Sequence, residues 1–182
     1  QKIKEFHKVH PLVKFHIHST TADEIKERIE NGLLDMGLVT EPVDISKYNF
    51  FRLPQKEQWG ILVHEKHRLA QKTFITPDDL INEPLIIAKR TAVQNELINW
   101  FNNSSEKLNI VATYNLILNA ANMVKHQICV ALCFNLNFDN LYQDLRFIPL
   151  FPEIKTGAVL IWKKNHIYSQ TMSHFIKSIK NA

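Results

Sequence analysis

The sequence predicts an α/β fold arranged in two lobes, and three observations carry this prediction. Short stretches in which apolar and polar residues alternate, as strands require, give way to stretches with helical apolar spacing. This strand and helix alternation occurs twice, once before and once after residue 84. A strand pair and an amphipathic helix then end the chain, so the two α/β units share a tail. We expect a cleft between them.

The first unit begins with residues 13–17 (VKFHI), which alternate in the manner of a strand. A helix over residues 22–33 follows, with hydroxyl side chains at its start and Gly32 to stop it. Residues 34–39 (LDMGLV) predict a second short strand. In such a unit the strand ends and the helix start share one edge, where ligands bind.

The second unit follows a strand pair at 51–53 and 59–64 and a short helix at 77–80. Its predicted elements are strand 85–88, helix 93–101, strand 110–114, helix 116–125 and strand 128–133. The tail adds strands 147–150 and 158–162 and a helix over 169–179. The apolar residues of that last helix fall on one face, which indicates packing against the rest of the fold.

Composition indicates a folded protein with a real core, since 45% of the 182 residues are apolar and 22% are charged. The 22 Lys and Arg exceed the 18 Asp and Glu by only four, and the basic residues are scattered along the chain. This charge is too weak to predict nucleic acid contact by this segment.

Two cysteines in one apolar run do not suggest a disulfide framework, and a reducing compartment fits better. The sequence has no run of about 18 apolar residues, and residues 1–15 lack the apolar core of a signal peptide. We therefore expect a cytoplasmic protein. The chain opens at Gln1 inside a predicted helix, which fits a segment of a longer protein.

Five segments of the sequence, in this order, resemble the conserved patterns of one known protein family. Residues 6–11 (FHKVHP) match the family pattern F-x-x-x-x-P. Residues 25–39 (IKERIENGLLDMGLV) resemble its helix ending in G-x-L-D-x-(G/A)-(L/I)-V. Residues 59–69 (WGILVHEKHRL) resemble its strand leading to His-Pro-Leu, with Arg68 in place of the proline.

The remaining two segments lie in the second unit. Residues 76–87 (TPDDLINEPLII) resemble the family's D-L-x-x-x-P-(L/F)-I segment. Residues 119–132 (NAANMVKHQICVAL) resemble its V-x-x-G-x-G-(I/V)-A-(L/I) run, although His126 and Ile128 stand where glycines are usual. The order of all five makes the chain similar to the effector-binding region of the LysR family of bacterial transcriptional regulators.

The resemblance implies a type-2 periplasmic-binding-protein-like fold with two crossover segments, near residues 61–65 and 148–152. Lobe I would combine residues 1–62 with 153–182, and lobe II would be residues 63–152. The resemblance also implies a small effector in the cleft and homodimers or homotetramers formed through this region. DNA would be bound by an N-terminal helix-turn-helix domain that precedes this segment.

The first lobe supplies hydroxyl groups to the predicted effector site. Ser19, Thr20 and Thr21 stand at a helix start, where hydroxyls and backbone N–H groups can bind an anion such as a carboxylate. A plain N-cap would explain the same residues. Thr40 takes the position where the resembled family places a cleft-facing residue, and a simple turn residue is the alternative.

The second lobe supplies the other candidates, which follow its three strands: Lys89, Arg90 and Thr91, then Asn115 with Leu116, then Phe134 with Asn135. Arg90 can hold a carboxylate with two hydrogen bonds, which makes an anionic effector the natural ligand. A solvated surface run would explain Lys89 equally well. Phe134 is also consistent with a packed core aromatic.

Other chemistry finds little support in the sequence. His16 and His18 lie on one side of a predicted strand, but a third ligand at a recognisable spacing is missing, so no metal or other cofactor is expected. Cys129 and Cys133 flank an apolar run and read as core residues. The sequence contains no G-x-S-x-G, phosphate-binding loop or dinucleotide fingerprint, and we predict no enzyme.

The leading hypothesis is a ligand-sensing regulatory domain of a LysR-type regulator, in which effector binding favours one arrangement of the lobes. A solute-binding protein of a transporter is the first alternative, and it would need a signal peptide or a lipidation cysteine. The second alternative is an enzyme on the same two-lobed fold, which would need an acid, base or nucleophile at the cleft.

Overall fold

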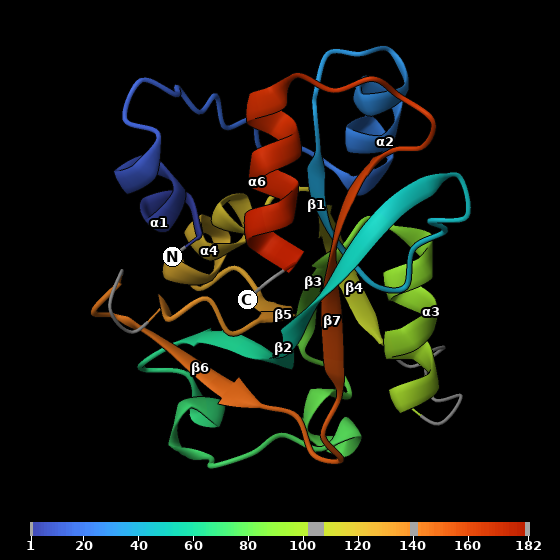
Figure 1. Ribbon diagram of the computed structural model, residues 1–182. Coiled ribbons are helices and arrows are strands. Elements are labelled where there is room, and N and C mark those ends of the chain that lie inside the picture. The colour runs from blue at the N-terminus through green and yellow to red at the C-terminus, as the bar shows by residue number, and fades with distance from the viewer. Residues whose placement is uncertain (1, 102–107, 139–141, 181–182) are drawn as a thin grey trace. The chain divides into compact units, whose positions relative to one another are not determined.

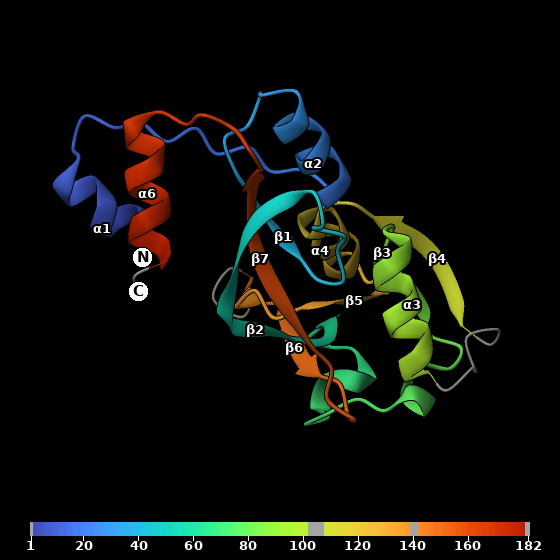
Figure 2. The same cartoon turned by 45° about the vertical axis from the view of Figure 1, so that its right-hand side comes forward.

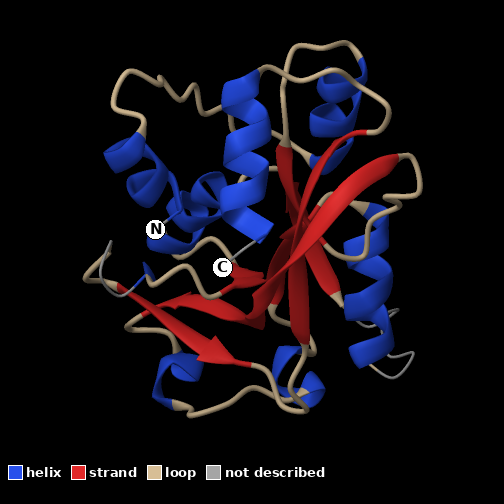
Figure 3. Ribbon diagram, viewed as in Figure 1, coloured by secondary structure: helices blue, strands red, loops and turns tan. Residues whose placement is uncertain are grey.

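The computed structural model describes residues 2–101, 108–138 and 142–180 (Figure 1). The helices are α1 (Lys2–Val9), α2 (Ala22–Glu30), α3 (Thr91–Trp100), α4 (Ile117–Lys125) and α6 (Gln170–Lys180), with 3-10 helices at Arg68–Gln71 and Pro77–Leu80. The strands are β1 (Gly37–Thr40), β2 (Tyr48–His64), β3 (Pro84–Ala88), β4 (Asn109–Tyr114), β5 (Val130–Phe134), β6 (Leu145–Pro149) and β7 (Lys155–Lys163). Figure 3 shows this mixture of helices and strands, and the predicted α/β class is confirmed.

The chain forms two compact units. Unit 1 comprises residues 1–39, 44–52 and 159–182, and unit 2 comprises residues 40–43 and 53–158. The two long strands β2 and β7 each contribute residues to both units. Both crossover segments expected from the family resemblance, 61–65 and 148–152, fall within unit 2. The lobe boundaries given above remain a prediction.

The sheet of unit 2 confirms the second predicted α/β unit. Its strands lie in the order β2-β5-β3-β4, and β6 also pairs with β2. β3 runs parallel to β4 and to β5, while β2 is antiparallel to β5 and β6. α3 connects β3 to β4 and α4 connects β4 to β5, so the helices are the crossovers that parallel strands require. Figure 2 shows α3 beside β3 and β4.

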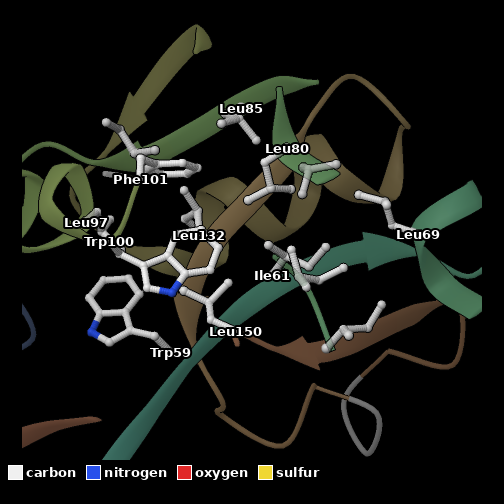
Figure 4. Packing of buried hydrophobic residues seen from close by; sticks show 14 of the residues in the cluster. Trp59, Ile61, Leu69, Leu80, Leu85, Leu97, Trp100, Phe101, Leu132 and Leu150 are labelled. Carbon is white, nitrogen blue, oxygen red and sulfur yellow. The ribbon is translucent and has the colours of Figure 1, made fainter. Parts of the chain in front are cut away.

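Alternate residues of β3 enter two different cores. Leu85 and Ile87 belong to a cluster that includes Leu97 of α3, part of which is drawn in Figure 4. Ile86 belongs to a second cluster, with Val124 of α4. Successive side chains of a strand point to opposite faces, so α3 and α4 cover opposite faces of this sheet.

Unit 1 has β7 between β1 and β2, together with helices α1, α2 and α6. The predicted strand at residues 13–17 is wrong, because these residues form no strand in the described part of the chain. Phe15 packs instead against Phe175 of α6, with ring centroids 5.4 Å apart, while Ile17 is 81% exposed. The alternation of residues 13–17 therefore reflects packing onto helices rather than strand pairing.

α2 begins and ends close to where the sequence predicts. The Thr21 hydroxyl accepts a hydrogen bond from the backbone N–H of Glu24 at 3.4 Å, which caps the first turn. Gly32 has φ +70°, and the next N–H, of Leu33, donates to the carbonyl of Arg28 at 2.8 Å. This left-handed glycine ends the helix three residues before the predicted end at residue 33.

Candidate functional site

The candidate site lies at the carboxyl edge of the parallel strands of unit 2. β3, β5 and β4 are parallel neighbours, so their ends at Ala88, Phe134 and Tyr114 meet at one edge. The backbone N–H of Lys89 donates to the carbonyl of Tyr114 at 2.8 Å and joins two of these ends. Open α/β sheets bind ligands along this edge. Arg90, Thr91, Asn115 and Phe134, predicted from sequence, lie on it or next to it.

Two helices begin at this edge. The residue before the first turn is Arg90 for α3 and Leu116 for α4, and among the described residues no side chain caps either start. The first N–H groups of a helix lack partners within the helix and carry partial positive charge. Such starts favour a bound anion. The edge therefore has the electrostatic character of an anion site.

Arg90 is held by the backbone rather than by another side chain. Its Nη1 donates to the carbonyl of Thr40 at 3.0 Å, and its Nη2 donates to the carbonyl of Pro42 at 2.7 Å. Both acceptors belong to unit 2. The structure thus brings together two predicted site residues, Arg90 and Thr40, although the contact uses the main chain of Thr40 and not its hydroxyl.

The other candidate site residues of unit 2 differ in whether they already have partners within the protein. Asn115 is exposed, and its Oδ1 accepts from the N–H of Leu116 at 2.9 Å. Phe134 packs on Trp59, with ring centroids 4.2 Å apart, so it is partly a core residue. Lys89 is exposed. Thr91 begins α3, but its side chain lies outside the part of the structure that is described.

The hydroxyl candidates belong to unit 1 and are mostly engaged within α2. Thr20 donates a short hydrogen bond to the Glu24 carboxylate, and Thr21 is the N-cap. These contacts matter for the carboxyl group, because the hydrogen bond from Thr20, followed by that from Arg28, lowers the pKa of Glu24. Ser19 is exposed. The helix-capping alternative thus accounts for Thr21, while Thr20 has a partner in the Glu24 carboxylate.

The metal and thiol candidates do not assemble into a site. Within the described ranges no group of three or more His, Cys, Asp or Glu is arranged to hold a metal ion. His16 and His18 are exposed. Cys129 and Cys133 are buried free thiols, and burial raises the pKa of both, which disfavours the reactive thiolate.

No described helix has the length and apolar character needed to span a membrane.

Sequence reasoning missed a polar group on the side of α3. Glu96 accepts a hydrogen bond from the Thr156 hydroxyl at 3.4 Å, and Thr156 in turn accepts from the indole N–H of Trp59 at 2.8 Å. A Glu in a helix and a Thr in a strand carry no motif. Only the fold brings residues 59, 96 and 156 together.

Solved structures similar to this chain include effector-binding domains of LysR regulators, which have a periplasmic-binding-protein-like fold. The effector-binding domain of QuiR in complex with shikimate has a TM-score of 0.83 and 18% identity, covering 97% of this chain and 86% of that one. HinK, a LysR regulator of Pseudomonas aeruginosa, has a TM-score of 0.80 and 19% identity, with 99% and 64% covered. The effector-binding domain of BenM with benzoate has a TM-score of 0.73 and 17% identity, with 99% and 83% covered.

The chain belongs to the family of LysR substrate binding domains, whose model matches residues 1–182. A curated relative is an uncharacterized HTH-type transcriptional regulator of Bacillus subtilis, YvbU, which is 22% identical over 139 residues. That match covers 76% of this chain and 46% of the relative. The chain therefore spans about half the length of the curated regulator that it matches.

Proposed function

We propose that the chain is the effector-sensing regulatory domain of a LysR-type transcriptional regulator, and that it binds a small carboxylate at the carboxyl edge of unit 2. The observation that carries the proposal is the start of two helices at one sheet edge, with no side-chain cap among the described residues. Related domains give independent support, because QuiR is described with shikimate and BenM with benzoate, both of which are carboxylates.

Arg90 is the side chain that we assign to the carboxylate. Its guanidinium carries more donors than the two that reach Thr40 and Pro42, so it can add a charge-assisted hydrogen bond to a ligand. Asn115 offers an exposed amide on the neighbouring helix start. Amide, guanidinium and helix N–H groups bind anions well but lack a nucleophile and base, so we infer binding rather than catalysis.

The whole regulator is proposed by family analogy. The two lobes would be residues 1–62 with 153–182 and residues 63–152. The domain would form homodimers or homotetramers, and a helix-turn-helix elsewhere in a longer cytoplasmic protein would bind DNA. Binding of the effector to one lobe arrangement more tightly than to another would then change the DNA-bound state.

The test is a titration of the purified domain with single carboxylic acids, beginning with benzoate and shikimate, followed by thermal shift and calorimetry. A ligand that binds only the folded state raises stability by RT ln(1 + [L]/Kd). Arg90→Gln should weaken the binding of a carboxylate by about tenfold or more, which corresponds to ~1.4 kcal/mol.

Arg146→Gln is the matched control, because Arg146 also lies in unit 2 and also donates to two backbone carbonyls, those of Gln143 and Leu145. It should leave the affinity unchanged. Equal weakening by both substitutions would assign the effect to lost structural hydrogen bonds and would contradict a ligand role for Arg90. Failure of every carboxylate to bind would contradict the proposed function.

A further inference from the structure

A polar cavity lies in unit 2, beside α3. Its volume is about 560 Å³, within the range of about 300–1,000 Å³ that small-molecule sites occupy. The residues that line it are Glu41, Pro42, Lys56, Asn95, Glu96, Asn99, Lys155, Thr156 and Gly157. All belong to unit 2, so a single compact unit forms the whole cavity.

Glu96 is oriented within this cavity by a buried hydrogen-bond chain. The Trp59 indole can only donate, so its bond to Thr156 leaves the hydroxyl proton of Thr156 for Glu96. Thr156 is only 3% exposed, so water does not compete for these two hydrogen bonds of its hydroxyl. Burial raises the pKa of Glu96, although the bond from Thr156 opposes this. A partly desolvated carboxylate of this kind is stabilised by a cation placed beside it.

The charges around the cavity balance. Glu41 and Glu96 bring carboxylates, and Lys56 and Lys155 bring ammonium groups. Lys155 already pairs with Glu153 at 2.9 Å, so Lys56 is the better placed of the two to receive a negative ligand group. The two carboxylates disfavour a simple anion, and the two lysines disfavour a simple cation. A ligand with one group of each sign satisfies both requirements.

We propose that this cavity binds a free α-amino acid. The ammonium group of the ligand lies against Glu96 and its carboxylate lies against Lys56. The amides of Asn95 and Asn99, one helical turn apart on α3, supply further hydrogen bonds to the ammonium or to the carboxylate. This site shares no side chain with the carboxyl-edge site assigned to Arg90. It therefore does not depend on the proposed carboxylate effector.

Trp59 provides a direct reporter, since its indole N–H is two hydrogen bonds from Glu96. The chain has three tryptophans, so the indole region of a ¹H–¹⁵N spectrum contains three resonances, and Trp59→Phe assigns one of them. Titration with the free amino acids, one at a time, should give a saturable shift of the Trp59 resonance with at least one of them. Trp162, which lies in unit 1, should not shift.

The pairing of charges between the ligand and the cavity is then tested by changing the ligand and by changing the protein. The N-acetyl and the amide derivatives of the active amino acid each lack one charge, and each should lose at least tenfold in affinity. Glu96→Gln should do the same. Glu65→Gln is the matched control, because Glu65 is exposed, lies in unit 2 and pairs with Arg146 outside the cavity. Should Glu96→Gln fail to fold, Lys56→Gln removes the opposite charge at an exposed position.

Three results would overturn the proposal: no amino acid shifts the Trp59 resonance, both charge-deleted derivatives bind as well as the parent, or Glu96→Gln and Lys56→Gln both retain full affinity. Binding of the N-acetyl derivative alone would indicate an anion site instead. Asn115→Ala, in the proposed carboxylate site and outside the lining of the cavity, should leave this titration unchanged, which separates the cavity from the proposed effector site.

Discussion

The starts of α2 and α3 resemble each other in sequence but differ in structure. Both follow a short polar stretch, and both are predicted anion sites. At α2 the chain supplies its own partners, because Thr21 caps the helix and Thr20 bonds Glu24. At α3 the preceding residue is Arg90, whose side chain turns back to the carbonyls of Thr40 and Pro42. A helix start satisfied by its own side chains is structural, whereas one without a cap can accept a ligand.

The largest expected effect comes from adding an N-cap side chain to a helix that has none. Leu116→Asp places a capping carboxylate before α4, at a residue that is 39% exposed. It should stabilise the fold by ~1 kcal/mol, because Asp is a strong N-cap and its charge complements the helix dipole. It should also weaken carboxylate binding by about tenfold or more, because like charges would meet. Calorimetry and thermal denaturation measure both effects.

Leu12→Asp makes the same chemical change at a residue that is 93% exposed in unit 1. It should alter neither the melting temperature nor the ligand affinity. If Leu116→Asp binds carboxylates as tightly as the unmodified protein, the start of α4 takes no part in the site.

Removing the N-cap of α2 should have an intermediate effect. Thr21→Ala removes the hydroxyl that accepts from Glu24, and loss of an N-cap costs ~1 kcal/mol of unfolding free energy. Urea denaturation of the domain measures this loss. The affinity for carboxylates should not change. A loss of affinity as large as that of Arg90→Gln would show that the start of α2 also contacts the ligand. It would contradict the distinction drawn between the starts of α2 and α3.

The smallest effect concerns the Glu24 carboxyl. Thr20→Val removes the hydrogen bond that contributes most to lowering its pKa, so the pKa should rise toward the ordinary value. A lowered pKa in the folded state gives stability that is present above the unfolded pKa and is lost as pH falls through the folded pKa. The variant should therefore lose less stability on acidification. A ¹³C titration of Glu24 reads the shift, and Thr113→Val, exposed on β4, should leave it unchanged.

Sequence patterns predicted the elements that depend on local chemistry. The parallel β3-α3-β4-α4-β5 unit followed from the apolar runs and the helical spacing, and Gly32 ended α2 because only a left-handed residue permits that turn. The strand at residues 13–17 failed, since alternation describes one buried side but not what buries it. Phe15 is partly buried by α6, whose sequence lies more than a hundred residues away.

The site was harder to predict than the fold. The predicted strand ends correctly placed Arg90 and Asn115 at the carboxyl edge of the sheet, because that edge follows from topology. The sequence could not show that Arg90 donates to the carbonyls of residues 40 and 42, or that Thr20 turns to Glu24. The cavity on the side of α3 had no counterpart in the sequence, since its residues come from four separate segments. These features depend on side-chain direction and on contacts between distant parts of the sequence, which sequence patterns do not show.

The burial of both native thiols has a practical consequence. Cys129 is 6% exposed and Cys133 is 1% exposed, and the raised pKa of each leaves little thiolate near neutral pH. A maleimide fluorophore should therefore react at an introduced surface cysteine and spare the native pair. Leu12→Cys and Thr73→Cys, both at exposed positions outside the proposed sites, would carry a donor and an acceptor dye on units 1 and 2. Energy transfer between the dyes would then follow the two units during ligand addition, in a protein that needs no cysteine removed beforehand.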